Sequence, residues 1–179
     1  MLKHPREHFA DFDGDGLADV LLCESEGWAG GVEDEVVGRA PGVAQGAEAV
    51  GIDQSRLSLL LAVLEKRAGL HLVADDVYVN LAGGMSIEEP AVDLAIVAAV
   101  ASSLRNRPIA SGTVVFGEVG LGGEVRGVAQ ANLRIREAEQ MGFTRIVLPA
   151  SNMDASEEMG KAQLVGVRSV GEALDQLLA

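Results

Sequence analysis

The sequence is poor in the residues that build disulfide frameworks and most zinc sites. Its 179 residues include one cysteine, Cys23, which excludes a disulfide framework and any zinc site with two or more cysteine ligands. The histidines are His4, His8 and His71, so the main body of the chain has no histidine-rich metal centre. Aromatic residues make up only 3% of the chain, and the core must therefore consist mainly of Val, Leu, Ile and Ala.

Long apolar runs are also missing. No stretch approaches the roughly 18 residues needed to cross a bilayer, and the N-terminus does not resemble a secretory signal. Apolar residues make up 48% and charged residues 23%, which is typical of a globular protein. We expect a soluble, cytoplasmic protein without membrane contact, built from one ordinary domain or from one domain with an appendage.

Positive charge is scarce, because 14 basic residues face 27 acidic ones and the net charge is -13. This balance disfavours a broad electrostatic surface for DNA, since phosphate contacts need Lys and Arg, but it allows a local basic patch. The acidity is concentrated near the start: residues 1–50 contain 11 acidic and 3 basic residues.

The pattern changes near residue 50. Residues 1–50 are acidic, rich in glycine and without sustained periodicity, so we expect a weakly ordered leader with a short strand at 18–23. From residue 51 to residue 179 the chain is regular and is expected to form one domain. A helix starts after Asp53 or Ser55, and Pro90 starts a helix that is apolar on almost every side.

The remaining elements follow from period, turn residues and β-branching. We expect strands at 77–81, 113–116, 145–148 and 163–167, helices or helical turns at 129–141, 154–161 and 171–178, and a glycine-rich hairpin after Phe116. Because helices and strands alternate but the hairpin is antiparallel, the pattern predicts a compact layered fold of both element types, without a purely parallel sheet.

Catalytic motifs are mostly absent. The sequence contains no G-x-x-x-x-G-K-[ST] phosphate loop, and its glycine-rich run at 117–123 lies between strand-like segments. Ser86, Ser102 and Ser103 are nucleophiles in type only, because His71 is the one histidine of the regular part and is expected to be an ordinary surface or half-buried residue. We assign no catalytic triad.

One acidic run has metal-ligand spacing. Carboxylates stand at positions 1, 3, 5 and 9 of a candidate calcium loop: Asp11, Asp13, Asp15 and Asp19. Gly16 provides the sharp turn, and the pattern resembles the single loops of integrin-type propeller and dockerin-like repeats. It departs from the EF-hand, because position 12 is Leu22 instead of Glu, and it occurs once. A solvated acidic turn is the alternative interpretation.

A family resemblance covers most of the regular part. It is carried, in order and at the expected spacing, by GIDQSRLSLLLAVLEKRAGL, DVYVNLAGGM, EEPAVDLAIVAAVASSLRNRPI, VVFGEVGLGGEVRGV and RIREAEQMGFTRIVLPASN. These segments resemble the C-terminal domain of the RadA (Sms) family of bacterial DNA repair proteins. Magnesium-chelatase-like and ComM-type proteins share the implied fold, but FGEVGLGGEVR looks more like RadA. That fold is the α+β proteolytic domain of Lon, related to domain 2 of small-subunit ribosomal protein five.

The resemblance also points to a lost catalytic site. Lon peptidases use a Ser–Lys dyad, and an alignment on Pro90, Pro108 and the hairpin glycines puts the serine position at Ala91 and the lysine position at Arg134. Alanine offers no nucleophile, and arginine holds its proton too tightly to act as a general base. The resemblance therefore implies an empty peptidase scaffold.

In RadA proteins, the resemblance implies, the Lon-like domain contributes ring assembly and DNA contact. The whole protein is an ATP-driven hexamer that performs branch migration on branched DNA with a RecA-type recombinase. Arg126, Arg134 and Arg136 are our DNA-contact candidates, although the last two cannot share a helix face. Arg105 and Arg107 flank another helix end.

Other parts of a RadA protein are not recognised in this chain. By the resemblance, ATP, Mg²⁺ and Zn²⁺ belong to an upstream ATPase domain and a four-cysteine finger. Residues 1–50 do not resemble the segment that should precede Gly51, so we expect a foreign leader produced by a gene fragment, a fusion or a shifted reading frame.

Two further functions remain open at this stage. One is a calcium-binding interaction protein on a degenerate Lon-like scaffold, in which the Asp11–Asp19 loop governs function. The other is a peptidase with a displaced nucleophile, for which Ser86 is the candidate.

Overall fold

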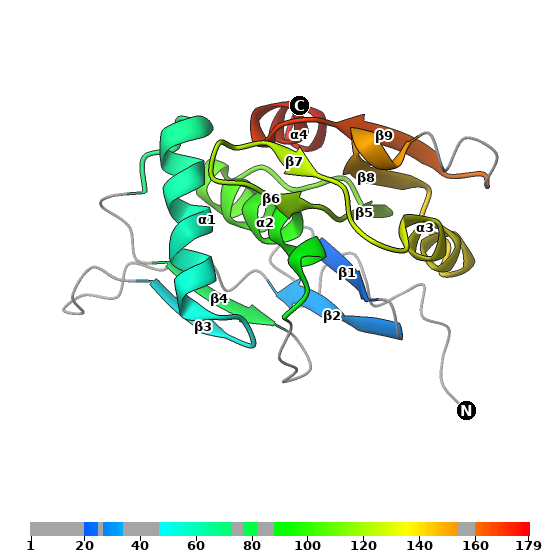
Figure 1. Ribbon diagram of the computed structural model, residues 1–179, viewed down its shortest axis with the longest axis horizontal. Coiled ribbons are helices and arrows are strands. Elements are labelled where there is room, and N and C mark those ends of the chain that lie inside the picture. Colours follow the sequence, from blue (N-terminus) through cyan, green and yellow to red (C-terminus); the bar gives the residue numbers. More distant parts are fainter. Residues whose placement is uncertain (1–19, 25–26, 34–46, 73–76, 82–87, 154–159) are drawn as a thin grey trace.

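The computed structural model describes residues 20–24, 27–33, 47–72, 77–81, 88–153 and 160–179. Helices cover a seven-stranded sheet of order β3-β4-β2-β1-β5-β8-β9, beside a two-stranded sheet of β6 and β7 (Figure 1). The strands are β1 Val20–Glu24, β2 Gly27–Glu33, β3 Ala47–Val50, β4 Val77–Leu81, β5 Thr113–Val115, β6 Glu118–Val119, β7 Val125–Arg126, β8 Arg145–Pro149 and β9 Gln163–Val167. The helices are α1 Gln54–Arg67, α2 Asp93–Arg105, α3 Ala131–Gln140 and α4 Val170–Leu177, with short 3-10 turns η3 Pro90–Val92 and η4 Ala150–Asn152.

The large sheet is mixed, which agrees with the α+β class expected from the sequence. Strands β3 and β4 are parallel, as are β1 and β5, β5 and β8, and β8 and β9, whereas β2 runs antiparallel to both β1 and β4. Alternate side chains of β5 and β8 enter two different clusters. Val115 and Val147 pack with α1, α2 and α4, and Val114 and Ile146 pack with α3.

Helix α2 is the centre of the larger cluster. It follows Pro90 and η3, as expected, and every described residue from position 91 to position 102 is buried. Such an all-round apolar helix is stable only when it is covered on every side. It contacts α1, α4, β1 and β2, so its first turn has a fixed position relative to the rest of the domain.

Helix α1 begins and ends as its sequence predicted. The Asp53 carboxylate caps it by accepting the Arg56 backbone N–H at 2.9 Å. The last helical residue is Arg67, Ala68 is the C-cap, and Gly69 follows with φ +66°. The hairpin was also predicted correctly: Glu118 pairs with Arg126 across β6 and β7, and Gly123 turns with φ +83°.

The described residues before position 51 contain more strands than the sequence indicated. The expected strand at 18–23 is present as β1, and two further strands, β2 and β3, precede residue 51. The β2 sequence GWAGGVE has three glycines and no apolar alternation, so its pattern gave no strand signal. Pairing of its backbone with β1 and β4 provides the hydrogen bonds, which do not depend on the side chains. The sheet thus includes strands from both sides of residue 50.

The C-terminal elements match their prediction closely. Strand β9 has the predicted bounds, and α4 begins one residue earlier than expected, capped by the Ser169 hydroxyl, which accepts the Glu172 N–H at 3.2 Å. Residues 154–159, which form most of the helical turn expected at 154–161, lie outside the described residues. No helix in the described part is long and apolar enough to cross a membrane.

Candidate functional site

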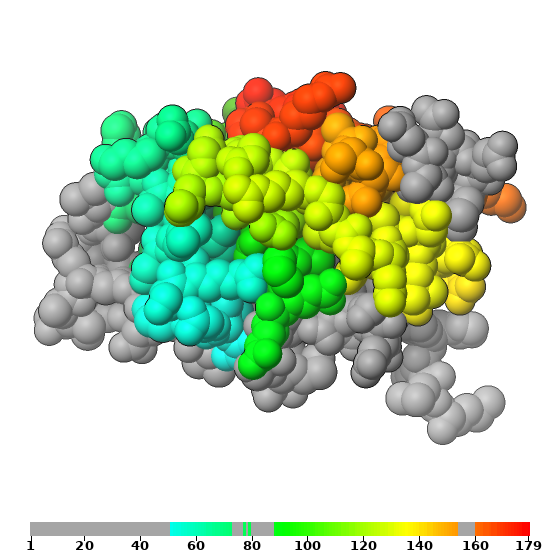
Figure 2. Space-filling model, viewed as in Figure 1, coloured from blue at the N-terminus to red at the C-terminus, as the bar shows by residue number. Residues whose placement is uncertain are grey.

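The first turn of α2 and the η3 turn before it lie where three other elements meet. In Figure 2 this segment (green) is bordered by α1 (cyan), α3 (yellow) and the β6–β7 hairpin (yellow-green). Backbone hydrogen bonds attach it to the start of the hairpin: Gly117 N–H donates to the Ala91 carbonyl at 2.8 Å, and Leu94 N–H donates to the Gly117 carbonyl at 3.0 Å. A side chain at Gly117 would approach Val125, Leu94 and Pro149 at 3.0–3.3 Å, so glycine permits this close approach.

The Glu89 carboxylate connects the segments that contain the two positions assigned by the sequence to a lost dyad. Ala91 is buried in η3, and the Arg134 guanidinium of α3 forms an ion pair with Glu89, two residues before Ala91. Neither side chain can act as the nucleophile or the general base of a Ser–Lys dyad. The two positions that the resemblance assigned to a dyad thus contain an alanine and an arginine in a partly buried ion pair.

Arg134 does not reach the surface. It is 1% exposed, its Nε donates to the Ala129 carbonyl at 3.3 Å, and its guanidinium carbon lies 6.0 Å from the centre of the Phe116 ring. A guanidinium in this position cannot approach a DNA backbone in this structure, which corrects our expectation for this residue. Its charge serves the contact between α3 and η3, where it is compensated by Glu89.

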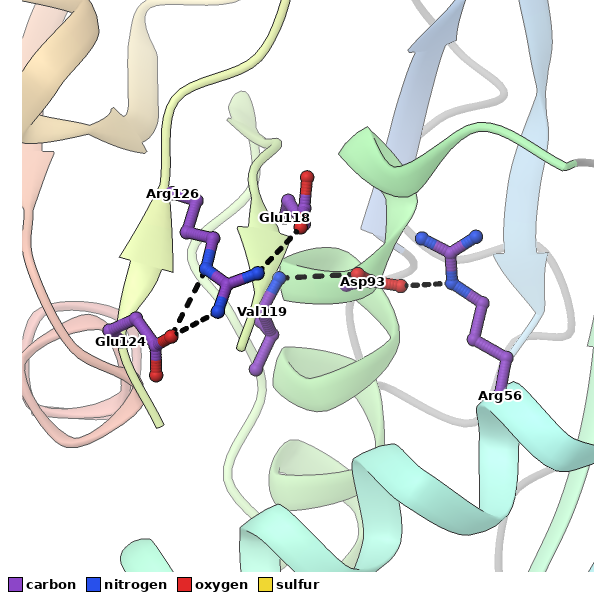
Figure 3. Close-up of polar contacts among 6 residues, drawn as sticks. All are labelled: Arg56, Asp93, Glu118, Val119, Glu124 and Arg126. Atoms are coloured by element: carbon purple, nitrogen blue, oxygen red, sulfur yellow. Dashed lines mark hydrogen bonds and ion pairs between the residues drawn. The ribbon is translucent and has the colours of Figure 1, made fainter. Parts of the chain in front are cut away.

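A second buried charge lies at the first residue of α2. Asp93 is 3% exposed, and its carboxylate accepts from Arg56 Nε at 2.5 Å and from the Val119 backbone N–H at 3.2 Å (Figure 3). Burial raises the pKa of Asp93, and this effect outweighs the lowering by the Arg56 hydrogen bond, the Val119 hydrogen bond and the Arg56 charge. Asp93 therefore joins α1, α2 and the hairpin.

The hairpin has its own exposed charge cluster. Arg126 contacts two acidic residues, Glu118 at 3.2 Å and Glu124 at 2.5 Å (Figure 3). Hydrogen bonds to Glu124 and Glu118 raise the pKa of Arg126. The pKa of Glu124 is lowered, first by a hydrogen bond to its own backbone and then by Arg126. Two carboxylates offset the charge of Arg126, which remains a predicted DNA contact.

Sequence reasoning placed two arginines of α3 on different faces, and the structure agrees. Arg136 is exposed, whereas Arg134 is buried two residues earlier. Sequence reasoning did not identify Glu89, Asp93 or Arg56 as members of the site. The signal available was an acidic residue on each side of Pro90-Ala-Val, because a charged residue in an apolar run requires a partner.

The other candidate catalytic and metal residues that the structure describes do not add to this site. His71 is exposed, as expected. The buried Ser102 hydroxyl donates to the Arg107 carbonyl at 2.6 Å, just beyond the helix end and not within its own helix. Ser86 and the Asp11–Asp19 loop, with Asp13 and Asp15, lie outside the described residues. Within the described ranges, no group of three or more His, Cys, Asp or Glu side chains is placed to hold a metal ion.

Comparison with known proteins gives two kinds of similarity. Residues 43–152 match the family model described as subunit ChlI of Mg-chelatase. Among curated proteins, the chain is 48% identical over 126 residues to DNA repair protein RadA of Bacillus subtilis, covering 70% of this chain and 28% of that protein. RadA of Escherichia coli is 46% identical over 126 residues, covering 70% and 27%. RadA of Pseudomonas aeruginosa is 45% identical over 128 residues, covering 72% and 28%. The chain thus matches little more than a quarter of these relatives.

Proposed function

This chain belongs to the family of subunit ChlI of Mg-chelatase and has RadA proteins among its homologues, and on that premise we propose that it acts as a non-catalytic, Lon-like domain of a RadA-type DNA repair protein. Its role is to assemble subunits into a ring, a homo-hexamer, and to contact branched DNA during branch migration in the bacterial cytoplasm. A RecA-type recombinase is the expected protein partner.

The observation that carries this proposal is the set of residues at η3, the first turn of α2 and the part of α3 that contacts η3. Ala91 and Arg134, which the resemblance assigns to the serine and lysine of a Lon-type dyad, supply no nucleophile and no base. Arg134 instead joins α3 to η3 through Glu89, and Asp93 joins α2 to α1 through Arg56. These contacts are suited to holding a rigid shape for assembly.

The ATP chemistry of the proposed whole protein needs residues that this sequence does not contain. A phosphate-binding loop of the form G-x-x-x-x-G-K-[ST] does not occur in these 179 residues. A single cysteine likewise cannot form a four-cysteine zinc finger. ATP, Mg²⁺ and Zn²⁺ are therefore assigned, within this proposal, to other domains of a RadA-type protein.

Self-association of the purified chain tests the assembly role. We expect light scattering to give a mass well above the 18.6 kDa of one chain, rising with concentration toward a closed ring. A mass that stays at 18.6 kDa up to high concentration would contradict a role in ring assembly. The full-length relative from Bacillus subtilis, measured under the same conditions, provides the reference for complete assembly.

A further inference from the structure

The described arginines divide into two groups by what their guanidinium groups contact. One group forms ion pairs with carboxylates: Arg56 with Asp93, Arg126 with Glu118 and Glu124, and Arg134 with Glu89. The members of the other group form no ion pair with a carboxylate of the described residues. They include Arg105, Arg107 and Arg145. Only the second group has uncompensated positive charge to offer a ligand.

Two members of this second group meet at the C-terminal end of α4. Arg107 donates to the Leu178 carbonyl at 3.0 Å, and Arg145 donates to the Gln176 carbonyl at 2.8 Å. The two acceptors are only two residues apart, so the two guanidinium groups lie near each other although 38 residues separate them in sequence. The partial negative charge of a helix C-terminus favours cations there but does not cancel a full charge.

The third member is close to Arg107 in sequence. Arg105 is the last residue of α2, it is exposed, and it lies two residues before Arg107. The turn between them is well fixed: Asn106 adopts the left-handed conformation with φ 49°, and Arg107 N–H donates to the Ser102 carbonyl at 3.0 Å. The three residues Arg105, Arg107 and Arg145, which we call the α4-end patch, thus come from α2, its following loop and β8.

We propose that the α4-end patch binds the phosphate groups of a nucleic acid backbone, and this inference rests on the DNA-contact role proposed above. A guanidinium group has five N–H donors, so Arg107 and Arg145 keep donors for phosphate oxygens after bonding to a carbonyl. The patch differs from the hairpin, where the Arg126 guanidinium already forms ion pairs with Glu118 and Glu124. Contacts of this kind position a protein on DNA without reading its sequence.

Arg105 gives the cleanest test, because no hydrogen bond or ion pair to another described residue depends on its side chain. Binding to a fluorescently labelled four-way DNA junction is measured by anisotropy between 50 and 200 mM KCl. We expect Arg105→Gln to weaken binding roughly three-fold or more and to lower the slope of log K against log salt by about 0.9. Arg107→Lys and Arg145→Lys, which keep the charge, are expected to retain most of the affinity.

Arg168→Gln is the matched control, because Arg168 is also exposed but precedes the opposite end of α4. Its affinity and salt slope are expected to stay close to those of the wild type. Thermal unfolding of each variant establishes that the fold is retained.

The outcomes separate this inference from the proposed function. If the wild type binds the junction but Arg105→Gln weakens binding no more than Arg168→Gln, the patch assignment is wrong and the DNA role stands. If the wild type shows no salt-dependent binding, the DNA role and the patch assignment both fail. If Arg105→Gln reduces self-association and leaves DNA affinity unchanged, the patch contacts another copy of the chain, and the inference is overturned.

Discussion

Replacing Arg134 by alanine is expected to lower the free energy of unfolding by about 4 kcal/mol, as for other buried ion pairs that lose one partner. The side chain is 1% exposed and fills the space between Phe116, Ala129 and Glu89. Its removal leaves a cavity and an unpaired carboxylate that is only partly accessible to water. Chemical denaturation of both proteins, analysed with a common m-value, measures the difference.

The neighbouring Arg136 provides the control for this prediction. Arg136→Ala removes the same side chain from the exposed face of the same helix, and we expect a change within about 0.5 kcal/mol. If Arg134→Ala cost less than 1 kcal/mol, the Glu89 ion pair would not hold α3 against η3. The structural role assigned to this position would then have to be abandoned.

Replacing Asp93 by alanine is expected to cost about 3 kcal/mol at neutral pH. This value is at the low end for a broken buried pair because the Arg56 side chain is 22% exposed and can still reach water. The Val119 N–H also loses its acceptor, which adds a buried unsatisfied donor at the hairpin. Asp53→Ala is the control, since it removes an exposed helix-capping carboxylate and should cost about 1 kcal/mol.

The cost of Asp93→Ala should also depend on pH. Burial raises the pKa of Asp93 in the folded state, so the folded protein holds this proton more tightly than the unfolded chain. The stability linked to that proton is fully present below the ordinary aspartate pKa of about 3.9 and is lost as pH rises through the raised value. The wild-type advantage over Asp93→Ala should therefore shrink as pH rises through this window. An advantage that grows with pH would show that the Arg56 charge dominates.

The regular part of the fold could be predicted because its local signals agree with one another. Asp53 and Gly69 delimit α1, Pro90 precedes α2, and glycines mark the hairpin, so the bounds differ by only a few residues. Strand β2 could not be predicted, because its glycine-rich sequence is a strand only through pairing with β1 and β4. Pairing between distant segments leaves no periodic signal in the sequence.

For the candidate site, the sequence indicated two positions but none of their contacts. Alignment on the glycine and proline residues identified Ala91 and Arg134, and in the structure Arg134 forms an ion pair with Glu89, two residues before Ala91. The exposure of Arg134 was predicted wrongly, because an arginine in an amphipathic helix is usually solvated. Nothing local in the α3 sequence shows that Arg134 is buried. The burial of Arg134 depends on its contact with Glu89, just before η3, which lies 45 positions earlier in the sequence.

The account depends most on the absence of peptidase chemistry at the start of α2. The direct measurement is incubation of the purified chain with an unstructured protein substrate, with cleavage followed by gel electrophoresis and mass spectrometry. We predict no cleavage by the wild type, because Ala91 and Arg134 supply neither nucleophile nor base. Cleavage that is present in the wild type and abolished by Ser86→Ala would contradict the account and would show a peptidase with a displaced nucleophile.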